Sequence, residues 1–480
     1  MDVYSIISLF GGLALFLYGM HTMSAGLEKL SGSKLQSTLQ KMTAHTSTSL
    51  IFGAAITIAI QSSSALTVML VGLVNSGIMQ LEQTVSVILG GNIGTTLTAW
   101  ILSLSGISGD SIFINLLKPE NFSPIVALIG VIMIMACNTQ KKKDIGGVFV
   151  GFAILMYGMT LMSGSVAPLA GMPEFTGILT AFNNPFLGVL VGLVFTGIIQ
   201  SSAASVGILQ ALSLTGCITY GMAIPLVMGL NIGTCATALL SSIGTTKNAR
   251  RVAIVHITGK IIGTVFCMIV FYGLNAIIGF GFINSPLSAP EVALCHTVFN
   301  IITTIILLPA RKVLIKISRI VVRGNDAKQS EVFLDERLLL SPGLAVHESY
   351  NMAVKMSDIA RSCVLTAMGL MLSYDNDKAA DVKTEETELD MYEDKLGSFL
   401  VKLSASALSD NDSADVSKLL HNIGDFERIG DHALNIRQSA KEMHEKGLTF
   451  SEHATEEVNL LFSALNEILT LAMDSFKDDD

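Results

Sequence analysis

The chain contains an internal repeat in which equivalent residues are separated by a constant shift of 139 positions. Gln61-Ser62-Ser63-Ser64 recurs as Gln200-Ser201-Ser202-Ala203, and Tyr18-Gly19-Met20 recurs as Tyr157-Gly158-Met159. The same shift carries Asn92-Ile93-Gly94-Thr95 onto Asn231-Ile232-Gly233-Thr234. Because no insertion or deletion interrupts this match, we expect the two halves to fold alike, with their Gln-Ser-Ser stretches meeting at one centre.

Composition predicts that most of the chain lies in a lipid bilayer. Half of the 480 residues are hydrophobic, 14% are charged, and no Asp, Glu, Lys or Arg occurs between Glu174 and Lys247. A membrane-spanning helix needs about 20 mostly apolar residues, and several segments before residue 310 meet this length. The sequence therefore predicts a multi-pass membrane protein. It shows no nucleic-acid-binding motif, and its acidic balance argues against nucleic acid as a partner.

The charges divide the chain into two parts. Residues 1–323 contain 16 Lys or Arg and 8 Asp or Glu, whereas residues 324–480 contain 14 and 31. We expect a membrane part followed by a soluble acidic domain, with helices near 345–373, 380–407, 412–446 and 451–475. The predicted domains are a first transmembrane repeat at 1–139, a second repeat with the helices that follow it at 140–323, a linker at 324–342 and the helical domain at 343–480.

Loop charge predicts how the chain is oriented. Basic residues cluster at 29–41, 141–143, 247–251 and 311–323, and the positive-inside rule places these segments in the cytoplasm. The loops one repeat away from the first three clusters contain no Lys or Arg. Equivalent loops would therefore face opposite sides, which is the pattern of an inverted repeat and is common in secondary transporters. The loops without Lys or Arg are 168–180, 280–282 and 108–112.

The crossings agree with these loop positions only if the stretches around Gln61 and Gln200 are broken, re-entrant hairpins. Each hairpin would return to the side of the membrane from which it enters. The N-terminal segment is then a first membrane helix that begins outside, and the acidic domain lies inside. The predicted crossings are 82–104, 121–138, 145–165, 219–244, 252–279 and 291–309.

The repeated Gln-Ser-Ser stretches are the candidate substrate site. Polar side chains in an apolar segment cost free energy unless they are hydrogen-bonded or bind something polar. A helix break leaves free amides at the positive end of the next helix, where an oxyanion can bind, and two such ends suit a tetrahedral phosphate. The alternative is that the serines only pack between helices. The candidate phosphate ligands are Gln61, Ser62, Ser63, Ser64, Gln200, Ser201 and Ser202.

Neutral oxygen atoms in the same segments would also suit sodium. No Asp or Glu occurs from Thr43 to Leu81 or from Phe175 to Thr246, so carboxylate coordination is not expected there. The Asn-Ile-Gly-Thr stretches are polar within apolar segments and could line the same cavity, although packing around small residues would also explain them. The candidate sodium ligands are Gln61, Ser64, Asn92, Thr95, Thr96, Gln200, Asn231 and Thr234.

A lysine lies inside a later apolar segment, one helical turn after His256. Two roles are open for Lys260: it could balance the charge of a bound anion, or its long side chain could reach back to the inner membrane surface. For His256 and His296 we expect hydrogen bonds between packed helices.

Residues 5–310 resemble the type II sodium-phosphate cotransporters, most specifically at Gln61 to Ser64, Gln200 to Ser202, Asn92 and Asn231. The resemblance implies that the Gln-Ser-Ser stretches provide phosphate and sodium ligands, that sodium is the coupling ion, and that transport proceeds by alternating access. The second copy has Ala203 in place of a third serine, which leaves a ligand at that position in doubt.

The C-terminal part resembles a PhoU-like helical domain through the stretch His421 to His432, with a weaker match at Thr384 to Leu396. In bacterial members of the family such a domain is attached, so the resemblance implies a bacterial inner membrane protein. It also implies that acidic side chains bind a metal, whereas an acidic, solvated helix face would need none. The candidate metal ligands are Glu386, Asp390, Asp425, Glu427 and Asp431.

These observations predict an all-α polytopic membrane protein with two inverted repeats, re-entrant broken hairpins and a soluble C-terminal helical bundle. The predicted function is sodium-coupled secondary transport of inorganic phosphate. Phosphate export, transport of another oxyanion, and a membrane-anchored phosphate or metal sensor are the alternatives. No enzyme is expected, because no constellation of nucleophile, base and orienting group is recognisable. The oligomeric state is open, with a homodimer as one alternative.

Overall fold

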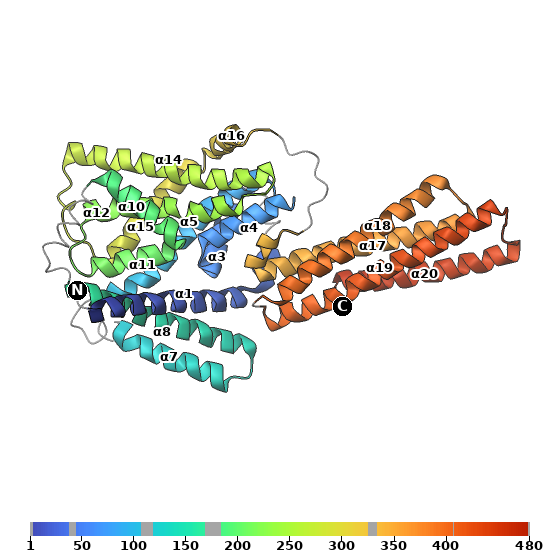
Figure 1. Cartoon of the computed structure of the whole chain (residues 1–480), viewed down its shortest axis with the longest axis horizontal. Helices are drawn as coiled ribbons and strands as arrows, with labels where there is room; N and C mark the ends of the chain where they lie inside the picture. Colours follow the sequence, from blue (N-terminus) through green and yellow to red (C-terminus); the bar gives the residue numbers. More distant parts are fainter. Residues whose placement is uncertain are drawn as a thin grey trace. The chain divides into compact units, whose positions relative to one another are not determined.

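The computed structural model describes residues 3–37, 45–106, 119–168, 184–324, 334–406 and 408–478. Regular secondary structure in these ranges is helical (Figure 1). The chain divides into two compact units, Met1–Leu340 and Ser341–Asp480, which are described separately below. Residues 325–333 of the predicted linker lie outside the described residues, as do the loops 108–112 and 169–180 and Lys41.

Equivalent helices occur in the two halves of the first unit. The shift of 139 residues relates α1 to α8, α3 to α10, α4 to α11, α5 to α12 with α13, and α7 to α14. In the first half the helices are α1 (Val3–Ser37), α3 (Thr46–Ile60), α4 (Ser63–Asn75), α5 (Leu81–Ser103) and α7 (Pro119–Ala136). In the second half they are α8 (Gln140–Val166), α10 (Pro185–Ile199), α11 (Ser202–Ser213), α12 (Tyr220–Gly233), α13 (Cys235–Ser241) and α14 (Lys247–Ile278), followed by α15 (Ala289–Leu307) and α16 (Arg311–Val321).

Glycines bring α3 into backbone contact with α5. A methyl group added at Gly53 would overlap the carbonyl oxygen of Val87, and one added at Gly90 would overlap that of Leu50. The equivalent contacts recur between α10 and α12, where Gly192 meets Leu226 and Gly229 meets Val189. Small residues allow this close approach of helices in a membrane. Both copies of the repeat therefore hold their interrupted helix against the next long helix in the same way.

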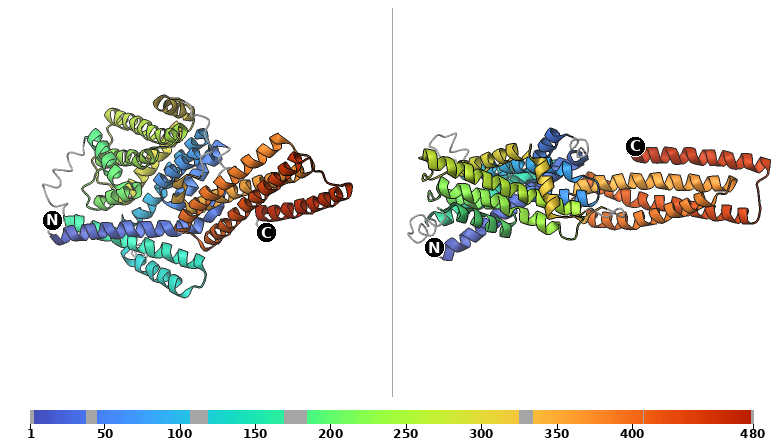
Figure 2. Two further views of the ribbon diagram at one scale, coloured as in Figure 1. Left: turned by 45° about the vertical axis from the view of Figure 1, so that its right-hand side comes forward. Right: turned by 90° about the horizontal axis from the view of Figure 1, so that it is seen from above.

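A second close contact joins the two halves directly. Gly12 of α1 lies against Gly158 of α8, and Gly19 lies against Gly151, so the two helices run antiparallel (Figures 1 and 2). Phe16 is fully buried in this contact. The shift of 139 residues exchanges these two glycine pairs, because it relates Gly12 to Gly151 and Gly19 to Gly158.

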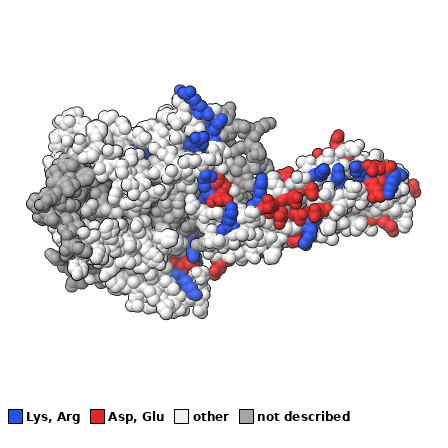
Figure 3. Space-filling view, viewed as in Figure 1, with Lys and Arg blue, Asp and Glu red and all other residues white. Residues whose placement is uncertain are grey.

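Among the described residues, six helices are long and apolar enough to cross a membrane. They are α1, α5, α8, α12 together with α13, α14 and α15. The predicted crossing at 121–138 corresponds to α7, whose apolar part Asn121–Ala136 is shorter than a full span. Large apolar side chains are exposed on α14, Ile269 and Ile277 among them, as expected for a surface that faces lipid. On the face drawn in Figure 3, charged side chains are sparse over most of this unit.

A short segment at the end of the first unit is bound to two of its helices. Asp335 accepts a hydrogen bond from the Asn75 side chain at the end of α4 and forms an ion pair of 2.7 Å with Arg337. The Arg337 guanidinium donates to the Ser241 carbonyl at the end of α13, at 2.6 Å. Leu338 within the 3-10 turn η4 (Glu336–Leu340) is fully buried. The segment thus joins an element of the first repeat to one of the second.

The second unit contains the four predicted helices. They are α17 (Pro342–Leu372), α18 (Asn376–Ser404), α19 (Asp410–Glu445) and α20 (Glu452–Asp478), each beginning and ending within a few residues of the prediction. α17, α18 and α19 pack on one another through buried residues such as Leu389, Tyr392 and Ile423. α20 packs on α17, where the Tyr350 hydroxyl donates to the Phe476 carbonyl at 2.9 Å.

Replacing Gly90 by alanine should destabilise the first unit. The added methyl group overlaps the Leu50 carbonyl, and forcing such helices apart costs about 1–3 kcal/mol. Gly164→Ala on α8 is the matched control, because nothing lies within 4 Å of a methyl group there. We expect the detergent-solubilised Gly90→Ala protein to lose its monodisperse elution peak at a lower temperature than the control. Equal thermal stability would contradict the close α3–α5 contact.

Candidate functional site

Two glutamines interrupt the helices inside the apolar unit. Gln61 has φ 58° and ψ 21°, and Gln200 has φ 58° and ψ 19°. They are the only non-glycine residues with positive φ in the described part of the chain. The left-handed conformation costs an L-residue about 1 kcal/mol or more, so its occurrence at equivalent positions indicates a functional constraint. The predicted breaks at both Gln-Ser-Ser stretches are confirmed.

Serines cap the helices that follow. The Ser62 hydroxyl accepts a hydrogen bond from the Ala65 amide at 3.1 Å, and the Ser201 hydroxyl accepts one from the Ala204 amide at 3.2 Å. The cap satisfies only one of the free amides at a helix start, and the others carry the positive end of the helix dipole. The starts of α4 and α11 are therefore suited to an anion.

A single polar pocket of about 220 Å³ contains both helix breaks. It is lined by all seven candidate phosphate ligands, with Ile60 and Ala203 beside them and Met20, His21 and Ser24 of α1. None of its described lining residues is Lys, Arg, Asp or Glu. The two stretches thus meet at one centre, and the polar groups there are neutral amides and hydroxyls, with one histidine.

The two glutamines differ in their surroundings. Gln61 is buried, and its side-chain oxygen accepts a hydrogen bond from the Thr98 hydroxyl of α5 at 2.8 Å. Gln200 is exposed. The Thr237 hydroxyl, which the repeat relates to Thr98, donates instead to the Thr234 carbonyl at 3.0 Å. The first break is therefore enclosed, whereas the second is open to its surroundings.

The Asn-Ile-Gly-Thr residues predicted as sodium ligands are buried but do not line this pocket. The hydroxyls of Thr95 and Thr96 donate to carbonyls of α5, and the Thr234 hydroxyl donates to the Asn231 carbonyl at 2.7 Å. The Asn231 side-chain oxygen accepts a hydrogen bond from Lys260 at 2.8 Å. In the second copy, a lysine ammonium thus already holds an oxygen that the sequence assigned to sodium.

Sequence reasoning missed two threonines that lie one helical turn before the helix breaks. Thr57 and Thr196 are equivalent in the repeat, and their carbonyls accept the amide hydrogen bonds of Gln61 and Gln200 at 2.7 Å. Their hydroxyls are buried without a hydrogen-bond partner in the described structure. Each packs on the glycine of the Asn-Ile-Gly-Thr stretch. Their position four residues before each glutamine could have identified them, because the carbonyl at that position accepts the last hydrogen bond of the helix.

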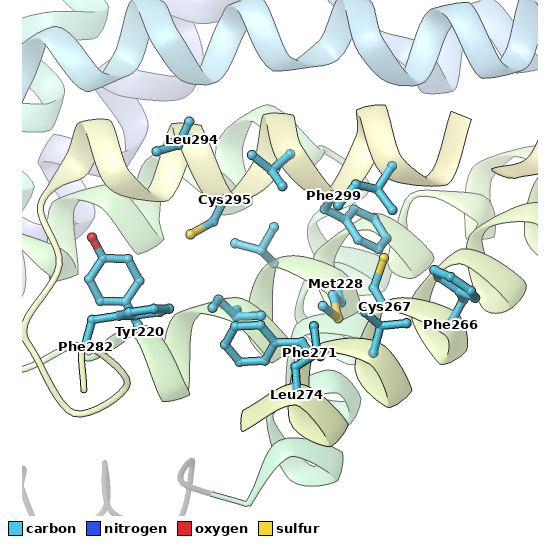
Figure 4. A pocket seen from close by; sticks show the side chains of 15 residues that line it. Tyr220, Met228, Phe266, Cys267, Phe271, Leu274, Phe282, Leu294, Cys295 and Phe299 are labelled. Atoms are coloured by element: carbon cyan, nitrogen blue, oxygen red, sulfur yellow. The ribbon is translucent and has the colours of Figure 1, made fainter. Parts of the chain in front are cut away.

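A larger pocket, of about 380 Å³, lies between α12, α14 and α15 (Figure 4). Its side chains are almost entirely apolar, with Phe271, Phe299 and Met228 among them, and the Tyr220 hydroxyl lies at one end. It offers no set of polar groups for an ion. The candidate site for a charged substrate is therefore the smaller pocket at the helix breaks.

The predicted metal ligands of the second unit do not assemble into a metal site. The described residues contain no group of three or more His, Cys, Asp or Glu placed to hold a metal ion. α18 and α19 pack through apolar side chains, which leaves Asp390, Asp425 and Asp431 exposed and Glu386 and Glu427 half-buried. The arrangement fits a solvated acidic helix face, and any metal role of these residues stays a prediction.

Comparison with known proteins identifies the family. The Na+/Pi-cotransporter family model matches residues 15–164 and again residues 154–289, which together span more than half of the chain. The chain belongs to the Na+/Pi-cotransporter family. The double match agrees with the internal duplication. The PhoU domain model matches residues 353–440, so the second unit of this Na+/Pi-cotransporter family member is a PhoU domain.

Several relatives of this Na+/Pi-cotransporter family member are similar over long stretches. "Putative inorganic phosphate export protein YjbB" of Escherichia coli K12 is 22% identical over 99% of this chain and 86% of its own length. "Uncharacterized protein YqeW" of Bacillus subtilis is 28% identical over 63% of this chain and 94% of its own. Human "Sodium-dependent phosphate transport protein 2B" is 30% identical over 29% of this chain and 19% of its own. No solved structure gives a significant match.

Glu427 should make the stability of the PhoU domain depend on pH. Burial raises the pKa of its carboxyl above 4.5, and the charges of Asp431, Asp390 and Glu393 raise it further. The ionised form is thus disfavoured in the folded chain, and its destabilising effect appears as pH rises above 4.5 and is complete above the folded-state pKa. Because the carboxyl is only partly buried and solvent screens its interactions, we expect Glu427→Gln to stabilise at pH 7 by less than about 1 kcal/mol.

The melting temperature of the full chain in detergent, at pH 7 and near pH 4, checks this expectation. The gain from Glu427→Gln should vanish near pH 4, where both proteins carry an uncharged side chain. Glu467→Gln on the exposed side of α20 is the control. An equal gain at both pH values would contradict the electrostatic explanation.

Proposed function

We propose that this protein is a sodium-coupled secondary transporter of inorganic phosphate. The observation that carries the proposal is the single pocket that contains both helix breaks. Membership of the Na+/Pi-cotransporter family supports both the substrate and the coupling ion. No catalytic role is assigned to any residue.

Phosphate is proposed to bind between the starts of α4 and α11. Free amides and the hydroxyls of Ser63, Ser64 and Ser202 would donate hydrogen bonds to its oxygens, and the two helix dipoles would favour its negative charge. Such neutral donors can hold an anion without a fixed cationic partner. The free energy needed to release the anion therefore stays small.

Sodium is proposed to bind next to the first helix break. Gln61 and Ser64 reach the phosphate pocket, and Asn92, Thr95 and Thr96 of the adjoining α5 carry further neutral oxygens. The hydrogen bond from Thr98 fixes the Gln61 side chain and links α5 to the break. A cation bound there would stabilise the neighbouring phosphate by direct attraction.

Alternating access is the proposed mechanism. The antiparallel packing of the equivalent helices α1 and α8 supports an inverted relation between the repeats. Burial of Gln61 and exposure of Gln200 support a state in which one of the two breaks is accessible. The basic segments support an orientation with the N-terminus outside and the PhoU domain in the bacterial cytoplasm.

Export of phosphate is the second candidate function. A relative that covers 99% of this chain is named as a phosphate export protein, whereas the human sodium-dependent relative covers 29%. Inward and outward carriers need the same phosphate ligands, so the site itself does not set the direction. The net direction follows from the electrochemical gradients of sodium and phosphate across the membrane.

Proteoliposomes with labelled phosphate test the proposal in both directions, with and without a sodium gradient. We expect sodium-stimulated flux, reduced about 10- to 100-fold in Gln61→Ala and in Gln200→Ala, because each loses a polar side-chain contact to a charged ligand. Gln140→Ala at the exposed start of α8 is the control. Absence of sodium-stimulated phosphate flux in either direction, with folded parent protein, would overturn the proposal and favour a membrane-anchored sensor.

A further inference from the structure

Lys260 lies deep inside the membrane unit. It is thirteen residues after the first residue of α14, Lys247, which corresponds to about 20 Å along the helix. Its side chain is only 4% exposed. Of the two roles left open by the sequence, a side chain that reaches back to the inner membrane surface does not fit this burial.

The ammonium group of Lys260 is held by two asparagines on neighbouring helices. Its Nζ donates to Asn231 Oδ1 of α12 at 2.8 Å and to Asn300 Oδ1 of α15 at 3.2 Å. Both amides are fixed by their other end, because Asn231 Nδ2 donates to the Val227 carbonyl and Asn300 Nδ2 donates to the His296 carbonyl, each at 2.9 Å. Both oxygens are thus turned toward one positively charged centre.

This centre contains no described carboxylate. The ion pairs among the described residues do not include Lys260. The titratable groups facing it are Cys235 of α13, His256 of α14 and His296 of α15. Both ring nitrogens of His296 lack a hydrogen-bond partner within the described structure, contrary to the expected packing bond. Burying a cation in a membrane with only neutral partners costs free energy, which indicates a functional role.

Balancing phosphate directly is not the role that this geometry favours. Lys260 is absent from the residues that line the pocket with the two helix breaks. Its partners are instead amide oxygens, which are the neutral ligands expected for an alkali cation. One of them belongs to Asn231, the second-copy equivalent of Asn92.

The repeat shows that the lysine belongs to one copy only. The shift of 139 residues carries Asn231 onto Asn92 but carries Lys260 onto Asn121. The first copy therefore keeps the asparagine and has a neutral residue where the second copy has a cation.

We propose that the Lys260 ammonium occupies a cation position in the second copy, as a tethered substitute for a sodium ion. Asn231 and Asn300 hold the lysine, and sodium binds only at the first-copy position that includes Asn92. The proposal rests on sodium coupling as proposed above. It predicts fewer sodium ions per transport cycle than two equivalent copies would bind.

Direct binding of radioactive sodium to the purified full-length protein tests this inference. Lys260→Ala opens an ion-sized space beside two fixed oxygens, and we expect this variant to bind one more sodium per chain than the parent. Adding Asn231→Leu should remove the extra ion. Lys312→Ala on the exposed face of α16 should leave the count unchanged. A folded Lys260→Ala protein with the parental count would overturn the proposal.

A second pair of variants keeps the lysine in place and tests the same idea if Lys260→Ala does not fold. Asn92→Leu should lose one bound sodium, whereas Asn231→Leu should keep the parental number, because its oxygen holds the ammonium. Loss of sodium in Asn231→Leu would overturn the proposal. Since binding is measured without transport, a parent that binds sodium but shows no sodium-driven phosphate flux would count against the proposed function alone.

Discussion

The membrane unit depends on one constraint: in a bilayer core there is no water to satisfy polar groups. An unbroken helix satisfies its own backbone N–H and C=O groups by hydrogen bonds. A helix that stops within an apolar unit leaves some of these groups without a partner. The breaks at Gln61 and Gln200 are two equivalent places where a helix stops in this way, and both have the same backbone conformation. Serine caps reduce the cost, and close glycine contacts hold each broken helix against the neighbouring helix of its repeat.

Duplication supplied two copies of this arrangement, and their differences give each copy its own role. The first copy encloses its glutamine and ties it to Thr98. The second leaves its glutamine exposed and places a lysine against its asparagine. Similar backbones with different polar partners give the two copies unequal surroundings next to one shared pocket.

The sequence could predict features that leave a local or repeated trace. The matched Gln-Ser-Ser stretches located both helix breaks, and apolar periodicity located the four helices of the PhoU domain. Contacts between distant helices leave no such trace. Thr98 is 37 residues from Gln61, and Lys260 is 29 and 40 residues from its two asparagines. The resemblance likewise named Glu427 and Asp431 as metal ligands, but it could not show how the acidic side chains of packed helices are placed in space.

The contacts of η4 fix the last residues of the first unit to helices of both repeats. Asp335 is bonded to the end of α4, which starts at the first helix break, and Arg337 is bonded to the end of α13 in the other copy. A change in the separation of these two helix ends must therefore be absorbed within Asp335, Glu336 and Arg337. α17 begins only five residues after Arg337, at Pro342. A displacement of either helix end would therefore reach the first residues of α17 through only a few residues of chain.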